Sequence, residues 1–367
     1  MCSLTAFSHK DLPEAVADLK AQCGEIKPRL ILCFAAPRYD LSSLSRQMQT
    51  EFPNACVVGC STAGEICDAR MLTDSVVALF LDEDVVEDVA WGVVLRISEQ
   101  VNVKDAFSSF ERHYQIPVSA MAADEYVGLV LVDGMSGGEE RLMEKIGDRC
   151  DLSFIGGAAG DDLQFRRTEV MVQGEAYTDA AVLLLIKPKR GFGIIKTQSF
   201  YGIGKTLMAT AVDETAREVI EFNHEPAIDA YAKALGVSWD ELPSLFMRHP
   251  LGLIIDGEPF VRSPQRIHDG ALAFYCKIPA GTELEVLDAT DIVEDTRRAV
   301  DNYEAKHGPA SALVDFHCIQ RTLQLRQENR CPEYGQIYKD RVAIGFSTYG
   351  EEYIHHINQT STILVLH

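Results

Sequence analysis

The chain has 367 residues, of which 47% are hydrophobic and 24% charged, and its formal net charge is -21. This length exceeds that of a usual single core, so we expect two or three domains. The acidic balance argues against nucleic acid or an anionic membrane as a main partner, because either would need a basic surface. The N-terminus lacks the pattern of a signal peptide and no long apolar run follows, so we expect a cytoplasmic protein without a membrane span.

Apolar runs and helical periodicity predict two similar series of elements in the first half of the chain. The first series is a helix over 10–24, a strand over 30–36, a helix over 41–52, a strand over 56–58, and two strands over 76–81 and 89–95 that form a pair. The second series is a strand over 127–132, a helix over 137–149, a strand over 152–155, and a pair of strands over 181–186 and 193–200. We therefore predict a helical extension over 1–27 and duplicated α/β units at about 28–100 and 125–205.

Each predicted unit contains a loop with glycines and an acid, at residues 55–66 and 153–162. In both, a short apolar run leads to a glycine, then small residues, then a second glycine followed at once by a carboxylate, Glu65 or Asp161. Glycines let the backbone turn sharply or approach a ligand closely. We therefore predict one ligand site built from two halves, with these candidate residues: Gly59, Ser61, Thr62, Gly64, Glu65, Gly156, Gly157, Gly160 and Asp161.

The two acids have two interpretations. Placed at strand-to-helix turns, they would bind a cationic group beside backbone N–H groups that bind an anionic one, which suits an amino acid. Alternatively, Glu65 and Asp161 cap helices by accepting N–H bonds of the first turn. The sequence does not choose between them.

The pattern changes near residue 206. Helices are predicted over 216–222, 227–235 and 291–307, with a capping box at Ser238 and Glu241, and short strands over 251–255, 257–261, 271–276, 284–287, 312–316, 341–346 and 362–366. We therefore predict an α/β domain over 28–210, with the two internal repeats, followed by an α+β domain over 211–367 whose sheet is mainly antiparallel.

Several motifs carry a resemblance to a known family. VVGCSTAGEI (57–66) and FIGGAAGD (154–161) resemble the signature loops of the FIST N-terminal domain. The stretches at 248–252, 318–321, 345–351 and 358–360 resemble the FIST C-terminal domain, so the resemblance covers roughly residues 28–365. It implies a signal-transduction sensor that binds small ligands, with amino acids as one suggested class. Within the site it adds Glu351 and Asn358 as ligand-binding candidates.

The ending IHHINQT (354–360) is similar to that of the stand-alone NosP branch. That branch is described as haem-binding and nitric-oxide-sensing, and it acts on a partner histidine kinase. Haem needs an axial ligand, and His356 is our first candidate as the metal ligand. His249, His268 and His317 are the reserves. For each histidine the alternative is a hydrogen-bonded side chain without a ligand role.

A polar set lies on otherwise apolar segments of the second half: Arg262, Arg321, Tyr349 and Glu351. It is either an internal Arg–Glu pair or a clamp on a carboxylate, from a haem propionate or a small ligand. The stretch YGIGKT (201–206) lacks the early glycine of a phosphate-binding loop, and no nucleophile–base pattern stands out, so we expect no enzyme. The predicted function is a haem-based nitric-oxide sensor that regulates a histidine kinase or another signalling protein, with a homodimer left open. The alternative is a metal-free module that binds an amino acid or a similar small molecule.

Overall fold

The computed structural model describes residues 2–255 and 257–367. The chain forms two compact units, and the first is discontinuous in sequence. Unit 1 holds Met1–Lys196, Thr296–His356 and Ser361–His367, and unit 2 holds Thr197–Asp295 and Ile357–Thr360. The predicted domains, 28–210 and 211–367, are each one continuous stretch, and this division stays a prediction. The compact units differ from it, because the chain leaves unit 1, forms most of unit 2, and then returns to unit 1.

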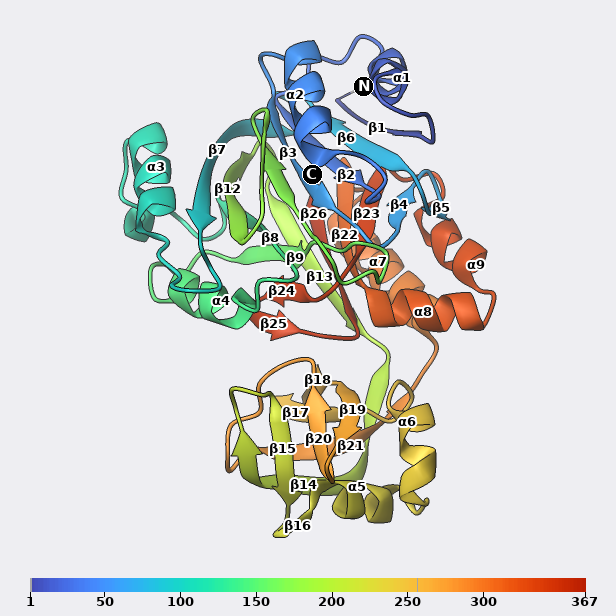
Figure 1. Cartoon of the computed structure of the whole chain (residues 1–367). Helices are drawn as coiled ribbons and strands as arrows, with labels where there is room; N and C mark the ends of the chain where they lie inside the picture. Colours follow the sequence, from blue (N-terminus) through green and yellow to red (C-terminus); the bar gives the residue numbers. More distant parts are fainter. Residues whose placement is uncertain (1, 256) are drawn as a thin grey trace. The chain divides into compact units, whose positions relative to one another are not determined.

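Three six-stranded sheets build unit 1 (Figure 1). The first sheet has, in spatial order, β1 (Ser3–Ser8), β6 (Val76–Leu81), β2 (Leu30–Ala35), β3 (Cys56–Ser61), β10 (Val170–Val172) and β11 (Glu175–Tyr177). The second has β25 (His355–Ile357), β24 (Glu351–Tyr353), β9 (Phe154–Ala158), β8 (Val127–Val132), β12 (Ala180–Pro188) and β7 (Val86–Leu95). The third has β13 (Phe192–Gln198), β26 (Thr360–Leu366), β22 (Ala312–Cys318), β23 (Ala343–Thr348), β4 (Glu65–Cys67) and β5 (Arg70–Leu72).

Helices flank these sheets and recur in unit 2. The helices of the first and last parts of the chain are α1 (Glu14–Cys23), α2 (Leu41–Glu51), α3 (Lys104–Tyr114), α4 (Glu139–Gly147), α7 (Ile292–His307), α8 (Ile319–Gln327) and α9 (Cys331–Gly335), with short 3-10 turns at Val118–Ala120 and Gln336–Tyr338. Unit 2 has an antiparallel sheet of β18 (Glu258–Arg262), β17 (Leu251–Ile255), β21 (Glu283–Ala289), β14 (Phe200–Asp213), β15 (Glu218–Phe222), β20 (Ala271–Phe274) and β19 (Pro264–His268), with β16 (Glu225–Pro226) on β15. Its helices are α5 (Ala227–Leu235) and α6 (Leu242–Leu245), and the predicted capping box lies at the 3-10 turn Trp239–Glu241.

One strand topology occurs three times in unit 1. In each case two strands run parallel, and the first of them also pairs with a third, antiparallel strand. The three sets are β2, β3 and β6, then β8, β9 and β12, then β22, β23 and β26. The structure thus confirms the mixed α/β and mainly antiparallel character, and it adds a third α/β set from the far end of the chain.

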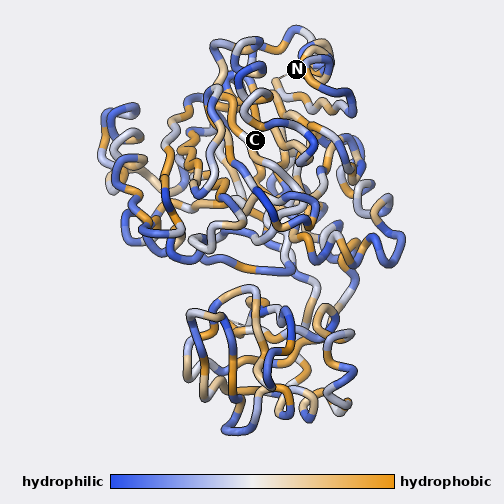
Figure 2. The backbone as a smooth tube through the Cα atoms, viewed as in Figure 1, coloured by the Kyte–Doolittle hydropathy of each residue, from blue (hydrophilic) through white to orange (hydrophobic). Residues whose placement is uncertain are grey.

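The three sets bury alternate side chains in one shared core. Leu32 of β2, Leu129 of β8 and Val314 of β22 all belong to it, together with neighbours two residues away on each strand. The opposite face of β2 packs under α1 and α2, and that of β8 packs under α3 and α4. Figure 2 shows the result, with hydrophobic colour along the central strands and hydrophilic colour on the flanking helices. These strands are buried on both faces, which explains their continuous apolar runs.

Three local predictions are wrong. Strands 76–81 and 89–95 do not pair, since β6 lies in the first sheet and β7 pairs with β12 in the second. Strands 181–186 and 193–200 do not pair either, because β13 lies in the third sheet. Residues 216–222 form a turn and strand β15 rather than a helix. The register of β14 and β15 shifts at bulges, so Val219 and Phe222 are both buried with a spacing that imitates a helix.

A glycine in the second strand of each set lets the parallel strands approach. Gly59 pairs with Cys33, Gly156 with Val130, and Gly345 with Asp315. A Cβ atom at any of the three glycines would overlap the carbonyl oxygen of its partner. No helix among the described residues is both long and apolar enough to cross a bilayer.

Gly156→Ala should therefore destabilise the protein by about 3 kcal/mol, since the overlap is with backbone that cannot move aside. Gly147→Ala is the matched control, because a Cβ there meets nothing within 4 Å at the end of α4. Urea unfolding of both variants measures the difference. Equal stability of the two would show that the strand spacing does not depend on the glycine.

Candidate functional site

Three loops meet where the parallel strands of the three sets end. Each carries a glycine followed by an acid: Gly64-Glu65 after β3, Gly160-Asp161 after β9, and Gly350-Glu351 after β23. We call residues 61–65, 158–161 and 347–351 together the triple-loop junction. Ligands of α/β proteins bind outside the carboxyl ends of such strands, so this junction is the candidate site.

Backbone hydrogen bonds join the three loops in every pairwise combination. The first and third loops exchange two bonds, the first and second share one, and the second and third exchange two. The bonds are Ala63 N to Ser347 O (3.1 Å), Ser347 N to Gly64 O (2.7 Å), Gly160 N to Ser61 O (3.0 Å), Ala158 N to Gly350 O (2.8 Å) and Tyr349 N to Ala158 O (3.1 Å). The junction is therefore held by main-chain contacts between segments far apart in the sequence.

Glu65 is a buried acid of the first loop, and β4 begins with it. Its carboxyl accepts hydrogen bonds from the Thr62 hydroxyl and from both the amide and the hydroxyl of Ser75. Burial raises the pKa of Glu65 to about 7, and the bonds from Ser75 and Thr62 oppose the rise. Both oxygens are thus occupied by the protein itself.

Asp161 organises the segment that follows the second loop. Its carboxylate accepts the amides of Phe165 (2.9 Å), Arg166 (2.7 Å) and Arg167 (3.0 Å), and the Tyr349 hydroxyl donates to it. Burial alone would raise the pKa of Asp161, but the bond from Tyr349 and the three amides together lower it. The carboxylate is therefore charged and fully engaged.

The predicted strand-to-helix turns are wrong at both acids. Glu65 opens a strand and Asp161 precedes an irregular segment, so neither caps a helix. The acids nevertheless accept N–H groups, as the capping alternative expected of them. After Asp161 the chain does not enter a helix, because Asp162 and Leu163 adopt left-handed backbone angles, with φ of 54° and 61°.

Residues 162–167 form a segment that presents an aromatic ring to solvent. Phe165 also has a left-handed φ of 50°, and 57% of its surface is exposed. Its ring stacks on Tyr349 at 5.2 Å, and the Tyr349 hydroxyl accepts the amide of Leu163 at 2.8 Å. Left-handed angles cost energy in residues with a Cβ, and such strain often marks functional segments.

Opposite charges lie at the rim of the junction. The exposed Arg326 guanidinium stands over Gly64, 3.1 Å from where a Cβ on that glycine would be. Burial raises the pKa of Asp162, and the charge of Arg326 opposes this rise, so the two groups interact. Arg326 comes from α8 and Asp162 from the segment that follows the second loop, so the rim joins two of the three sets.

The other predicted loop residues are mainly structural. Gly59 and Gly156 allow the strands to approach, Gly157 faces Thr348, and Gly160 lies against the Ala63 amide. Ser61 accepts the amide of Glu169 at 3.0 Å. Asn358 is buried and belongs to unit 2.

His356 is buried beside the third loop. Its Nδ1 lies 2.8 Å from Glu352 Oε1, and its ring fills the space where Gly350 would carry a Cβ. Burial alone would lower the pKa of His356, but the charge of Glu352, its hydrogen bond, and the acids Glu139 and Glu140 raise it to about 9. Burial also raises the pKa of Glu352 to about 7.

The remaining candidates are dispersed. His317 is fully buried beside the Tyr334 ring, and burial followed by the Arg321 charge lowers its pKa far below the usual value. Arg321 is buried and donates to Thr296 at 2.7 Å. Unit 2 contains His249 near Asp288, His268 bonded to Glu218, and Arg262 bonded to the Val261 carbonyl. The predicted polar set is therefore divided between the two units.

Three of the candidate histidines, His356, His317 and His268, do not fit haem in this conformation. A macrocycle needs an apolar slot beside an accessible ring nitrogen. His356 and His317 are both buried, with Gly350 and Tyr334 packed against their rings. His268 is exposed and hydrogen-bonded to Glu218 rather than set against an apolar wall. Over the described ranges 2–255 and 257–367, no group of three or more His, Cys, Asp or Glu side chains is arranged to hold a metal ion.

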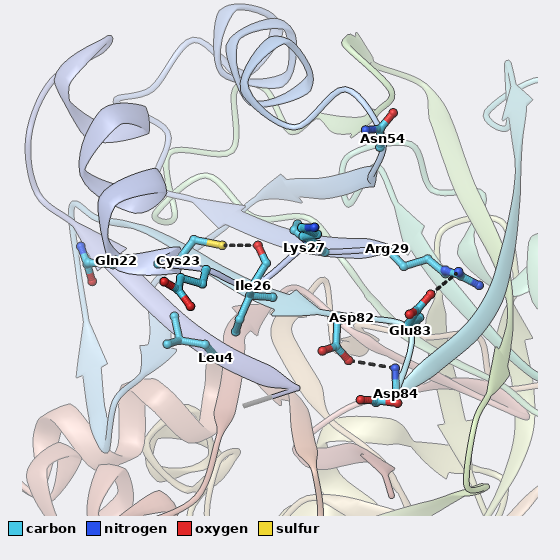
Figure 3. A pocket seen from close by; sticks show the side chains of 13 residues that line it. Leu4, Gln22, Cys23, Ile26, Lys27, Arg29, Asn54, Asp82, Glu83 and Asp84 are labelled. Carbon is cyan, nitrogen blue, oxygen red and sulfur yellow. Dashed lines mark hydrogen bonds and ion pairs between the residues drawn. The ribbon is translucent and has the colours of Figure 1, made fainter.

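A groove of about 800 Å³ lies at the other end of β2, where that strand begins (Figure 3). It is lined by Lys27 and Arg29 on one side and by the acids 82–84 on the other. Arg29 pairs with Glu83 at 3.3 Å, and Asp82 accepts the Asp84 amide at 2.9 Å. Arg29 and Glu83 are thus already paired with each other, and the groove lies at the opposite end of β2 from the three loops, so it is a weaker candidate than the junction.

Sequence reasoning missed four residues of the site: Ser75, Asp162, Phe165 and Arg326. It also treated Tyr349 as a cofactor ligand, although Tyr349 belongs to the junction. One signal was present, because Gly345 and Gly350-Glu351 repeat the spacing of Gly59 and Gly64-Glu65. Nothing in the sequence around Arg326 indicates its position over Gly64.

Comparison with protein families gives two adjoining matches. The model of the FIST N domain matches residues 29–225, and that of the FIST C domain matches residues 227–353. No curated protein matches the chain. The first match includes the loops of Glu65 and Asp161, and the second includes the loop of Glu351.

The buried pair of His356 and Glu352 should make stability fall as pH rises. Both folded-state pKa values lie above the unfolded ones, so folding takes up protons that are released between about pH 4.5 and 9. Relative to the double variant Glu352→Gln/His356→Gln, the wild type should lose several kcal/mol of stability over this interval, because each of the two pKa values is raised by more than one unit. Urea unfolding at several pH values measures it, and a constant difference would contradict the ion pair.

Proposed function

The chain belongs to the FIST family, and from this we propose that it is a sensor for a small zwitterionic ligand, such as an amino acid, which binds at the rim of the triple-loop junction. FIST domains are signal-transduction sensor domains for small ligands and are not a known enzyme family. The observation that carries the proposal is the pair of opposite charges at the rim, Arg326 and Asp162, with the exposed ring of Phe165 three residues after Asp162 in the chain.

Each part of such a ligand has a matching group. The planar guanidinium of Arg326 suits a carboxylate, and Asp162 suits an ammonium group. Phe165, stacked on Tyr349, offers an apolar face for the rest of the ligand. Glu65 and Asp161 are not the ligand carboxylates in this proposal, because their oxygens already accept bonds from the protein.

In this proposal, ligand binding is transmitted by a change in the conformation of the segment 162–167. Its left-handed residues are held by Asp161 and Tyr349, so a ligand that contacts Asp162 and Phe165 changes the energy of that conformation. A signalling partner, such as a histidine kinase, would bind the segment differently with and without ligand. Sensing then needs no change in the core of unit 1.

Arg326→Ala should weaken binding at least about tenfold, the loss expected for a hydrogen bond to a charged group. The ligand is first sought by thermal shift with the twenty amino acids, and the best of them is titrated by calorimetry. Arg46→Ala, an exposed arginine on α2, is the matched control and should bind normally. Unchanged affinity of Arg326→Ala, or no shift with any amino acid, would contradict the proposal.

The haem and nitric-oxide hypothesis stays a prediction of the NosP-like ending. Under our proposal, protein mixed with haem, reduced, and exposed to nitric oxide should give only the spectrum of free haem. An ultraviolet–visible titration tests this, with His356→Ala as the comparison. A sharp Soret band that shifts with nitric oxide and is lost in His356→Ala would favour the haem sensor over the zwitterion sensor.

A further inference from the structure

A groove of about 550 Å³ opens where strand β3 begins, at the opposite end of that strand from the triple-loop junction. Segments from across unit 1 line it: the residue before β2, the loop between α2 and β3, strand β7, helix α3, and the turn between β10 and β11. It adjoins the larger groove of Figure 3, since Arg29 and Asn54 line both. Its volume is typical of a site for a small molecule.

The least covered part of the shared core lines this groove. Val89 and Cys56 are the most exposed members of that core, with 9% and 6% of their surface accessible, and both line the groove. Trp91 lies two residues beyond Val89, so its side chain is on the same face of β7. It is 38% exposed, although the indole ring is large and mainly apolar. The groove thus leaves an aromatic ring and part of the core available to a ligand.

The charged groups that line the groove are already engaged by the protein. Asp88 Oδ1 lies 3.0 Å from Nε2 of His113, which comes from α3. Arg29 donates to the Glu87 carbonyl, and its guanidinium lies 3.3 Å from the Glu83 carboxylate. A ligand in the groove therefore meets no charge without a partner, which favours an uncharged ligand.

Uncharged polar groups of the groove, in contrast, have no hydrogen-bond partner among the described residues. They are the side-chain amides of Asn54 and Gln173 and the indole N–H of Trp91. Asn54 precedes β3, and Gln173 follows β10, which pairs with β3, so the two amides come from either side of the start of β3. An amide both donates and accepts, as a hydroxyl group does. These groups therefore suit a ligand that carries several hydroxyls.

We propose that this groove is a second ligand site, and that it binds an uncharged sugar, either a mono- or a disaccharide. One face of a pyranose ring consists of C–H groups, which can pack on the indole of Trp91 and on the apolar lining. The sugar hydroxyls can exchange hydrogen bonds with Asn54 and Gln173. A nucleobase fits less well, because a planar base has two faces to cover and the groove offers one large aromatic ring. The site is separate from the rim at Arg326 and does not depend on the function proposed for that rim.

Tryptophan fluorescence tests the proposal on the full chain, whose two tryptophans are Trp91 and Trp239. Trp239→Phe removes the indole in unit 2 and leaves Trp91 as the reporter. Glucose, galactose, mannose, N-acetylglucosamine, maltose and cellobiose are titrated, and at least one should change the emission in a saturable way. Adenosine and uridine are titrated in parallel. No saturable change with any of the sugars, or a change with the nucleosides alone, would overturn the proposal.

Variants then locate the bound sugar. Trp91→Ala should weaken binding about tenfold, the loss of one aromatic contact, and Asn54→Ala about fivefold, the loss of one uncharged hydrogen bond. Leu95→Ala is the matched control, since Leu95 is exposed on the same face of β7 but does not line the groove. Calorimetry measures the affinities, and circular dichroism confirms that each variant is folded. Equal affinity of folded Trp91→Ala and the wild type would place the sugar outside this groove.

Arg326→Ala separates the groove from the rim of the triple-loop junction. This variant should bind the sugar with wild-type affinity, because Arg326 does not line the groove. Conversely, Trp91→Ala should leave the binding of any amino acid at the rim unchanged. Loss of sugar binding in folded Arg326→Ala would place the sugar at the rim and overturn the proposal of a second site.

Discussion

The fold depends on the close meeting of three strand ends. Each second strand, β3, β9 and β23, must lie tightly against its parallel neighbour, and the glycines at 59, 156 and 345 make that spacing possible. The three loops then bond to one another through their main chains. Side chains there have little freedom to vary, because backbone from three distant segments occupies the space. The acids of the first two loops stabilise this arrangement, because they accept hydrogen bonds from backbone amides near the turns.

This constraint separates the structural part of the junction from the rim, where we propose that the ligand binds. Glu65 and Asp161 fix the loops, and the groups at the rim come from elsewhere: Arg326 from α8, and Phe165 from the segment that Asp161 organises. The residues that fix the loops and the residues at the rim are therefore different, so the rim residues can differ between proteins that share the same loops. In the proposed site, recognition depends on residues that lie outside the signature motifs, so the motifs identify the family but not the ligand.

The sequence predicts much of the fold and less of the site. Continuous apolar runs such as β2 and β8 are recognisable because both of their faces are buried. Strand pairing is harder to predict. Strand β7 pairs with β12 in the second sheet, and no feature of residues 86–95 themselves indicates that partner. The strand β15 has a helix-like spacing of buried residues, because bulges alter the period of its pairing with β14. Arg326 and Ser75 reach the junction only through tertiary packing, so no spacing rule could have placed them.

The discontinuity of unit 1 affects how the protein is made. The shared core needs β22, β23 and β26, which lie between residue 312 and residue 366, after nearly all of unit 2 has been synthesised. Until then the inner faces of the first two sheets have no third sheet to cover them. A nascent or truncated chain that ends before residue 312 exposes a large apolar surface and becomes a substrate for chaperones and proteases. Unit 1 can therefore be completed only after the residues of β26 have been translated.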